Sequence, residues 1–307
     1  MYKILAKSAL DLSQIEVKQR IGCDGIEIQL LDELYGPHGN HDWLYASDVF
    51  DLHKFLDQNI LAVHAPISKA YGDVLIERLA DDEDIMLFDQ LFYIANFIGR
   101  HIGRPIRVIM HSETSVSILQ DINNGWVRLV RYVDEMLTKY PFTELCIENV
   151  TPLRGIKDNR IIQLANNYYE DNVLMAKLLR AALHTDRVGV VLDTCHQGIT
   201  EMYMNLIYTL SPDIEKPDFS IEHYIQSYAP YLKIIHLADF KGNGYGKNHG
   251  TPFESQEKFN HIMDLVCKYV HPSCYITLEI NESNFMICEG YAQTKARLDY
   301  YFKQKAI

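Results

Sequence analysis

Short apolar runs alternate with longer segments whose apolar residues recur every three to four positions along the whole chain. The short runs are apolar on both faces, as strands of a parallel sheet are when helices cover both sides. The longer segments, such as MLFDQLFYIANFIGRHIG and WVRLVRYVDEMLTKY, have the spacing of amphipathic helices. This pattern predicts strands at residues 2–6, 25–30, 60–66, 106–112, 144–150, 188–194, 232–239 and 275–281.

Eight strands that alternate with helices are the count of a (β/α)8 barrel, and we expect a single TIM-barrel domain over residues 1–307. A doubly wound open sheet is the alternative, but it normally has fewer strands and a glycine-rich phosphate turn. No G-x-G-x-x-G or Walker-type loop follows any of the predicted strands. The longer connections follow strands and would therefore meet at the C-terminal face, where barrels build active sites; they span roughly residues 31–45, 67–83, 151–171 and 239–255.

The composition narrows the class of protein. The hydrophobic fraction of 48% allows a sizeable core, and the formal net charge of −12 weakens the case for a general nucleic-acid binder. The six cysteines form no CxxC pair, so we expect reduced thiols in a cytoplasmic protein. The N-terminal residues contain no secretory apolar region, and no segment approaches 18 uninterrupted apolar residues, so we expect neither secretion nor membrane insertion.

Side chains of the metal-ligand type stand at the ends of six successive predicted strands. A single His after an apolar run is more often a hydrogen-bonded core residue, and a single Glu can be a salt-bridge partner. Repetition at one relative position changes this reading, because such groups are costly alone in a barrel mouth and are satisfied around divalent cations. Glu27, on the second strand, fits less well and can be a structural, substrate-contacting or ligand carboxylate. The positions are His64, His111, Glu148, Asp193, His236 and Glu279, with His196, Asp239 and His249 in the following segments.

The motifs GCDGIEI, VHAP, VIMHSE, CIENV, LDTCHQ, IIHLADFKG and LEIN follow one another in this order. In their order and spacing, the chain resembles the xylose isomerase-like TIM-barrel superfamily over about residues 2 to 300. That superfamily contains sugar isomerases and epimerases, inosose dehydratase-type enzymes and the endonuclease IV family, also called AP endonuclease family 2. The resemblance therefore implies metal chemistry but leaves the reaction open between these branches.

The resemblance also implies which residues hold metal. The common core of the superfamily would place one ion on Glu148, Asp193, His236 and Glu279. In the endonuclease IV branch, His64 and His111 would join Glu148 around a second ion. A third ion would use His196 and His249, but the Asp expected two residues before His249 is Lys247. We therefore expect one to three ions of Zn, Mn or Fe, and no organic cofactor.

Two reactions fit this ligand set. In an isomerase or epimerase, Glu148 and Glu279 would act as acid and base across a carbon next to a carbonyl, and His196 would steady a substrate oxygen. In an endonuclease IV-like phosphodiesterase, clustered metals would activate a water and stabilise the departing phosphate oxygen. We expect Lys247, Asp239 and Lys241 to bind substrate, with Lys247 meeting an anionic group.

Several features of the sequence bear on the choice. The segment LDELYGPHGNHDWLYASD after the second strand has no Arg or Lys to follow a phosphate backbone, whereas both extra histidines and LDTCH favour phosphoester chemistry. We expect a metal-dependent isomerase or epimerase of a sugar, sugar phosphate or similar polyol. The alternative is the phosphodiesterase with nucleic acid as substrate. No membrane partner is expected, and the oligomeric state stays open.

Overall fold

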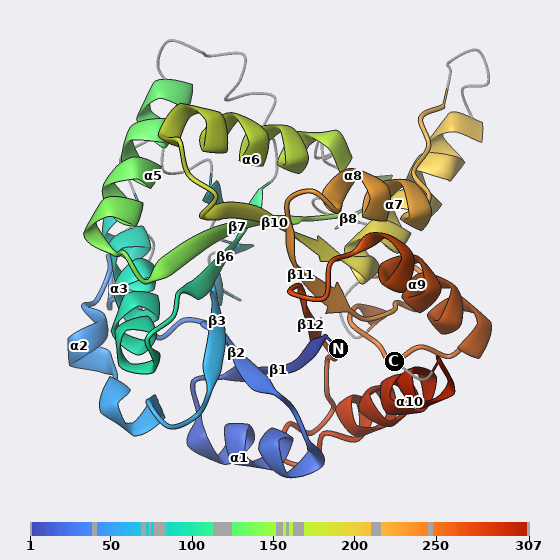
Figure 1. Ribbon diagram of the computed structural model, residues 1–307, viewed down its shortest axis with the longest axis horizontal. Helices are drawn as coiled ribbons and strands as arrows, with labels where there is room; N and C mark the ends of the chain where they lie inside the picture. The colour runs from blue at the N-terminus through green and yellow to red at the C-terminus, as the bar shows by residue number, and fades with distance from the viewer. Residues whose placement is uncertain are drawn as a thin grey trace.

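Eight parallel strands close into a barrel in the order β1-β12-β11-β10-β7-β6-β3-β2, and helices surround it (Figure 1). The predicted (β/α)8 barrel is therefore confirmed. The computed structural model describes residues 2–38, 42–68, 72–73, 75–76, 84–112, 125–151, 156–157, 160–161, 169–209, 216–244 and 248–305.

Each barrel strand falls within a few residues of its predicted position. The two largest differences are at C-terminal ends: the first barrel strand is three residues longer than predicted, and the eighth is three residues shorter. The strands are β1 (Lys3–Ala9), β2 (Gly25–Gln29), β3 (Ile60–His64), β6 (Ile106–Ser112), β7 (Thr143–Asn149), β10 (Val188–Asp193), β11 (Leu232–Leu237) and β12 (Tyr275–Leu278).

A long helix follows seven of the eight strands within the described residues. After β2 the chain instead forms the short α2 (Ala46–Val49) and a 3-10 turn η1 (Leu52–Phe55), because Phe50 takes an extended conformation with φ −121° and ψ 135°. The expectation of one full helix after every strand was wrong at this point. The other helices are α1 (Leu12–Ile21), α3 (Ile85–Ile102), α5 (Val127–Lys139), α6 (Tyr169–Leu183), α7 (Thr194–Thr209), α8 (Ile221–Tyr228), α9 (Gln256–Tyr269) and α10 (Glu289–Lys305).

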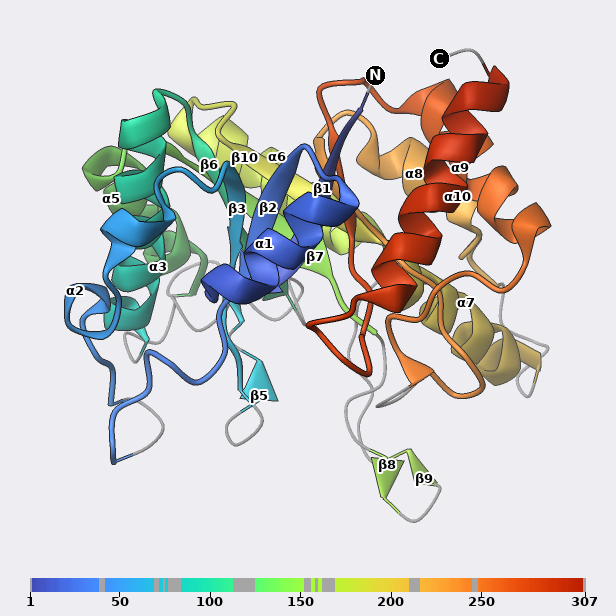
Figure 2. The same cartoon turned by 90° about the horizontal axis from the view of Figure 1, so that it is seen from below.

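Two small antiparallel sheets lie in the connections, β4 (Ile67–Ser68) with β5 (Gly72–Asp73), and β8 (Ile156–Lys157) with β9 (Arg160–Ile161). Figure 2 shows β5, β8 and β9 projecting from the end of the barrel opposite the two chain termini. This end is the C-terminal face of the strands. Among the described helices, none is long and apolar enough to cross a membrane.

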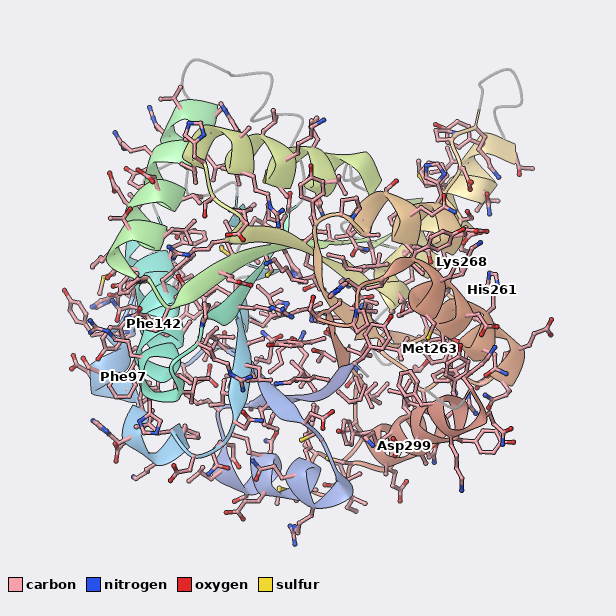
Figure 3. The ribbon with its side chains drawn as sticks, viewed as in Figure 1. Phe97, Phe142, His261, Met263, Lys268 and Asp299 are labelled. Carbon is pink, nitrogen blue, oxygen red and sulfur yellow. The ribbon has the colours of Figure 1, made fainter. Side chains whose placement is uncertain are left out.

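The barrel interior is built in layers, and side chains fill the ring of strands (Figure 3). An apolar cluster of five buried residues, packed against Tyr275, lies inside the barrel and is separate from the larger core between strands and helices. Because side chains alternate along a strand, the residue two positions further on points inward as well. Each member of the cluster precedes an inward-facing His, Glu or Asp by two residues; the members are Ala62, Ile109, Cys146, Val191 and Ile234.

Candidate metal centre

A polar layer lies directly above the apolar cluster and contains the predicted ligand residues. His64, His111, Glu148, Asp193 and His236 are each buried. The strand register brings them level, since His111 pairs with Glu148 across β6 and β7, and Asp193 pairs with His236 across β10 and β11. The apolar layer below them separates these groups from the N-terminal end of the barrel.

Two groups of donor atoms are close enough to surround an ion. His64, His111 and Glu148 form one group, and within each group the donor atoms lie within 4.8 Å of one another. The second group contains Glu148, Asp193, His236 and Glu279. Glu148 therefore belongs to both groups. Mixed imidazole and carboxylate donors suit Zn, Mn and Fe.

The two oxygens of Glu148 point to different sides. Its Oε2 lies 2.9 Å from His64 Nε2 and 3.7 Å from His111 Nε2, whereas its Oε1 lies 3.0 Å from His236 Nδ1. Burial opposes the charged carboxylate, but His236 and His111 outweigh it and hold the pKa of Glu148 well below its usual range. The carboxylate is thus ionised and faces both groups at once, as a bridging ligand would.

Glu27 orients His236 from the side opposite the donor groups. His236 Nε2 lies 3.0 Å from Glu27 Oε2, which also accepts a 2.8 Å hydrogen bond from Thr277 Oγ1. His236 Nδ1 is left facing Glu148 and lies 2.6 Å from Glu279 Oε2. A carboxylate that holds the second ring nitrogen is the usual support of a metal-binding histidine. Of the three roles open for Glu27, the contacts favour a structural one.

One of the two carboxylate oxygens of Asp193 lacks a hydrogen-bond partner among the described residues. Its Oδ1 accepts a 2.6 Å hydrogen bond from the backbone N–H of His196, but its Oδ2 is buried with no hydrogen-bond partner among the described residues. Burial, with Glu279 and Glu148 nearby, raises the pKa of Asp193 to about 7. A divalent cation would supply the missing partner and the missing positive charge. The residues present therefore fit a bound metal.

His196, in the segment after β10, lies in the first turn of α7. The helix begins at Thr194, directly after β10, because Asp193 Oδ1 receives the free N–H of the first turn. His196 Nδ1 donates a 2.7 Å hydrogen bond to the Asn149 carbonyl, which leaves Nε2 with a lone pair. Burial, opposed by Glu148 and assisted by His111, lowers the pKa of His196 to about 4, so the ring is neutral at pH 7.

His249 approaches His196 from the segment after β11. The two ring centroids are 4.8 Å apart, and both residues line the same cavity. Burial, with His196 nearby, lowers the pKa of His249. Lys247, which stands where a third site would need an Asp, lies outside the described residues. The structure thus brings the two predicted histidines together, and the number of ions stays open between one and three.

The side chains of two polar residues next to these candidate ligands hold neighbouring strand ends together by hydrogen bonds. Asn149 Oδ1 accepts a 2.7 Å hydrogen bond from the Asp193 N–H, and Asn149 Nδ2 donates to the Asp193 carbonyl at 3.1 Å. Thr194 Oγ1 donates to the Ala238 carbonyl at 2.7 Å. Sequence reasoning missed both residues, although CIENV and LDTCH place them directly beside Glu148 and Asp193.

A cavity of about 520 Å³ opens above the ligand layer. His111, His196, His249 and Glu279 line one side, and uncharged polar side chains line the rest together with an apolar edge. The uncharged and apolar lining includes Ser8, Gln14, Gln29 and Asn281, with Leu31, Ile67, Ile280 and Phe285. The volume is within the usual range of small-molecule sites, roughly 300–1,000 Å³.

Lys7 also lines the cavity, and the sequence analysis did not identify it. Its Nζ lies 2.7 Å from Glu279 Oε1 and 3.6 Å from Glu27 Oε1. The signal was present, because Lys7 is a charged residue in an apolar strand near its C-terminal end. The predicted first strand stopped at residue 6, whereas β1 continues to Ala9.

Two residues expected to bind substrate have other partners. Asp239 Oδ1 lies 2.6 Å from Lys258 Nζ, and Lys241 Nζ lies 2.6 Å from Glu254 Oε1. Neither Asp239 nor Lys241 lines the cavity. Asp239 instead joins the segment after β11 to itself through paired backbone hydrogen bonds with Thr251. Substrate binding by these two residues stays a prediction.

The chain is 24% identical over 257 residues to a probable endonuclease 4 of Mycoplasma genitalium, which covers 81% of this chain and 77% of that protein. Among solved structures, 3-keto-D-glucoside 4-epimerase from E. coli aligns with a TM-score of 0.55 at 12% identity, over 99% of this chain and 100% of the epimerase. AP endonuclease family 2 from Brucella melitensis aligns with a TM-score of 0.57 at 12% identity, over 96% and 99% of the two chains. The chain resembles both groups.

A D-allulose 3-epimerase from Methylomonas sp., solved with D-allulose, gives a TM-score of 0.58 at 14% identity, over 99% of this chain and 96% of that one. No protein-family model matches. The expected resemblance to epimerase and endonuclease barrels is thus confirmed, and the proteins that the chain resembles are enzymes. At these identities the solved structures share the fold, and the reaction has to be inferred from the site.

Proposed function

We propose that this protein is a divalent-metal-dependent epimerase or isomerase that acts on a small polyhydroxylated substrate. The main support for this proposal is the set of side chains that line the cavity. The cavity joins a rim of ionisable side chains to a wall of neutral hydrogen-bonding groups, Gln14, Gln29 and Asn281. Amide and hydroxyl groups recognise sugar hydroxyls, whereas a nucleic-acid backbone calls for Lys and Arg. Among the described lining residues, Lys7 is the sole Lys or Arg, and it is paired with Glu279.

The two donor groups support the following roles for the metal ligands. Glu148, Asp193, His236 and Glu279 would hold a Zn, Mn or Fe ion, with Glu148 shared with His64 and His111 where a second ion binds. A bound ion would polarise the substrate carbonyl and so acidify the adjacent C–H.

Proton transfer falls to Glu148 and Glu279, which stand on different strands of the rim. One carboxylate removes the proton from the carbon next to the carbonyl, and the other returns a proton to the opposite face, so no net oxidation occurs. His196 is neutral, and its free Nε2 accepts a hydrogen bond from a substrate hydroxyl. The fixed Nδ1 contact with Asn149 holds the ring in place for this contact.

Exchange of a substrate C–H with solvent deuterium tests the proposal without knowledge of the final product. Metal-loaded protein is incubated in D2O with a panel of ketohexoses, ketopentoses and their phosphates, and NMR follows the proton next to the carbonyl. We expect exchange with at least one neutral ketose. Glu279→Gln should lose the exchange, and Glu144→Gln, at the other end of the barrel on the strand of Glu148, should keep it. No exchange across the panel contradicts the proposal.

A metal-dependent phosphodiesterase is the second candidate. The observation that favours it is the donor group of His64, His111 and Glu148, which would place a second ion beside the first. The sequence relative named endonuclease 4 points the same way. Cleavage of a DNA duplex with one abasic site, together with two or more ions per chain, would favour this reaction over the epimerase. One ion per chain and exchange of a ketose would favour the epimerase.

A further inference from the structure

Lys7 is a buried cation whose hydrogen-bonding capacity is mostly unused. Its side chain is 10% exposed, and an ammonium group has three donors. Glu279 Oε1 lies 2.7 Å from Nζ, but Glu27 Oε1, at 3.6 Å, is beyond hydrogen-bond distance. The described residues thus offer one close acceptor. A buried ammonium with idle donors is costly, which makes an additional partner favourable.

The position of Lys7 shows where such a partner would lie. Lys7 lines the cavity next to Glu279, at the boundary between the ionisable rim and the neutral wall. Lys7 and Glu27 are register partners on β1 and β2, and Thr277 fixes Glu27 from β12. The lysine is therefore held by neighbours on both sides. Its side chain lines the cavity, while its Nζ has almost no surface exposed to solvent. A substrate placed against Glu279 would be a neighbour of Lys7, and Nζ would have to turn toward it.

We propose, on the basis of the proposed function, that Lys7 is a catalytic residue whose N–H groups bind the substrate oxygen that becomes negative when the proton leaves. The reaction moves electrons from the broken C–H bond onto this oxygen, and the ammonium stabilises the resulting charge without transferring its own proton. Such a contact strengthens as charge develops, so it acts on turnover more than on substrate binding.

Lys7→Met tests this proposal, because methionine keeps the length of the side chain but has no N–H donor. With the ketose identified by deuterium exchange, we expect kcat to fall about 100-fold, as for loss of one oxyanion donor, with KM nearly unchanged. Lys233→Met is the matched control, since Lys233 Nζ lies 3.4 Å from Glu144 Oε2 and both side chains are 20% exposed outside the cavity. It should keep the wild-type kcat.

The metal content of the Lys7→Met variant distinguishes two roles of Lys7, contact with the substrate and positioning of Glu279. If Lys7→Met loses metal in proportion to its activity, Lys7 serves the ligands and the proposal is wrong. An unchanged kcat overturns it as well. If loss of the cation unfolds the protein, Lys7→Met combined with Glu27→Gln removes one buried charge of each sign and restores the balance.

A probe of binding separates this proposal from the proposed function. Glycolohydroxamate resembles the deprotonated substrate, and calorimetry on the metal-loaded proteins gives its affinity. We expect Lys7→Met to bind it at least 10-fold more weakly than wild type, and Lys233→Met to bind it equally well. If no ketose exchanges, the proposed reaction fails while this comparison still decides the role of Lys7. Equal affinity in Lys7→Met and wild type, or no binding to wild type, contradicts that role.

Discussion

Replacing Asp193 with Asn should make the metal-free protein more stable at alkaline pH. The substitution keeps an oxygen for the N–H of His196 and removes the charge at Oδ2, which has no partner among the described residues. Burial beside Glu279 and Glu148 raises the pKa of Asp193 from 3.8 to about 7. Because the pKa of Asp193 is higher in the folded than in the unfolded chain, the protonated carboxyl makes its full contribution to stability below pH 4. This contribution is lost as the pH rises towards 7.

The magnitude follows from the two pKa values. The buried charge costs the wild type about 4 kcal/mol at pH 8 and about 2 kcal/mol at pH 5, and the uncharged amide of the variant carries no such cost. The stability advantage of Asp193→Asn should therefore be about 2–3 kcal/mol larger at pH 8 than at pH 5. For a chain of this size, this corresponds to a difference in Tm shift of roughly 4 °C.

Thermal unfolding in the presence of a chelator, from pH 5 to pH 8, measures this effect. Asp11→Asn is the matched control, because Asp11 also caps a helix through Oδ1, to Gln14 N–H, but is exposed. Its Tm should change little at any pH. A metal titration of Asp193→Asn should show the opposite effect, with affinity reduced by more than the roughly 10- to 100-fold typical of a lost supporting contact. A pH-independent advantage, or wild-type metal affinity, would refute the reasoning.

Three further changes test other parts of the site and barrel. The double variant His64→Ala and His111→Ala should lower the metal content and leave the circular dichroism spectrum intact. Unchanged metal content and turnover would show that His64 and His111 only pack in the core. Asn149→Ala should lower the free energy of unfolding in urea by about 3 kcal/mol, because two buried backbone groups of Asp193 lose partners. A change near zero would show that the Asn149 side chain does not stabilise the end of β10. Gly99→Ala should cost about 1–3 kcal/mol, since its Cβ would lie 2.6 Å and 2.9 Å from two carbonyl oxygens, and an unchanged Tm would argue against this close approach.

The close approach at Gly99 shows how α3 is seated on the barrel. Phe142 lies beside α3, which carries Phe97 (Figure 3), and the Phe142 N–H donates a 3.1 Å hydrogen bond to Asn96 Oδ1. The carbonyl of Phe142 is also the nearest atom to the missing Cβ of Gly99. A larger residue would push the helix away from the start of β7.

The barrel and its ligand rim could be predicted because both follow from local patterns. A run that is apolar on both faces predicts a covered strand, and strand direction places every C-terminal end at one rim. The exact ends could not be predicted, because long-range contacts set them. The Ala238 N–H meets Thr194 Oγ1, and the Asn281 N–H meets the Gly250 carbonyl, so β11 and β12 stop earlier than their apolar runs.

The contacts of Lys7 and Glu27 also could not be predicted from the sequence. They arise where the last strand closes against the first, since Thr277 and His236 lie more than 200 positions from Glu27. The pattern of His, Asp and Glu at strand ends predicts both donor groups but not the cation beside them. The ion pairs of Asp239 with Lys258 and of Lys241 with Glu254 could not be predicted either, because the position of a residue after a strand does not determine its side-chain partner.

The direct passage from β10 into α7 has a consequence for how this barrel can diversify. The strand ends at Asp193 and the helix starts at Thr194, so no connecting residue separates them. An insertion here would displace Asp193 and His196 together and would break the contacts of both with Asn149. This corner is therefore closed to evolutionary change in length. New substrate preferences, in nature or in a designed library, have to come from the longer connections around the rest of the rim.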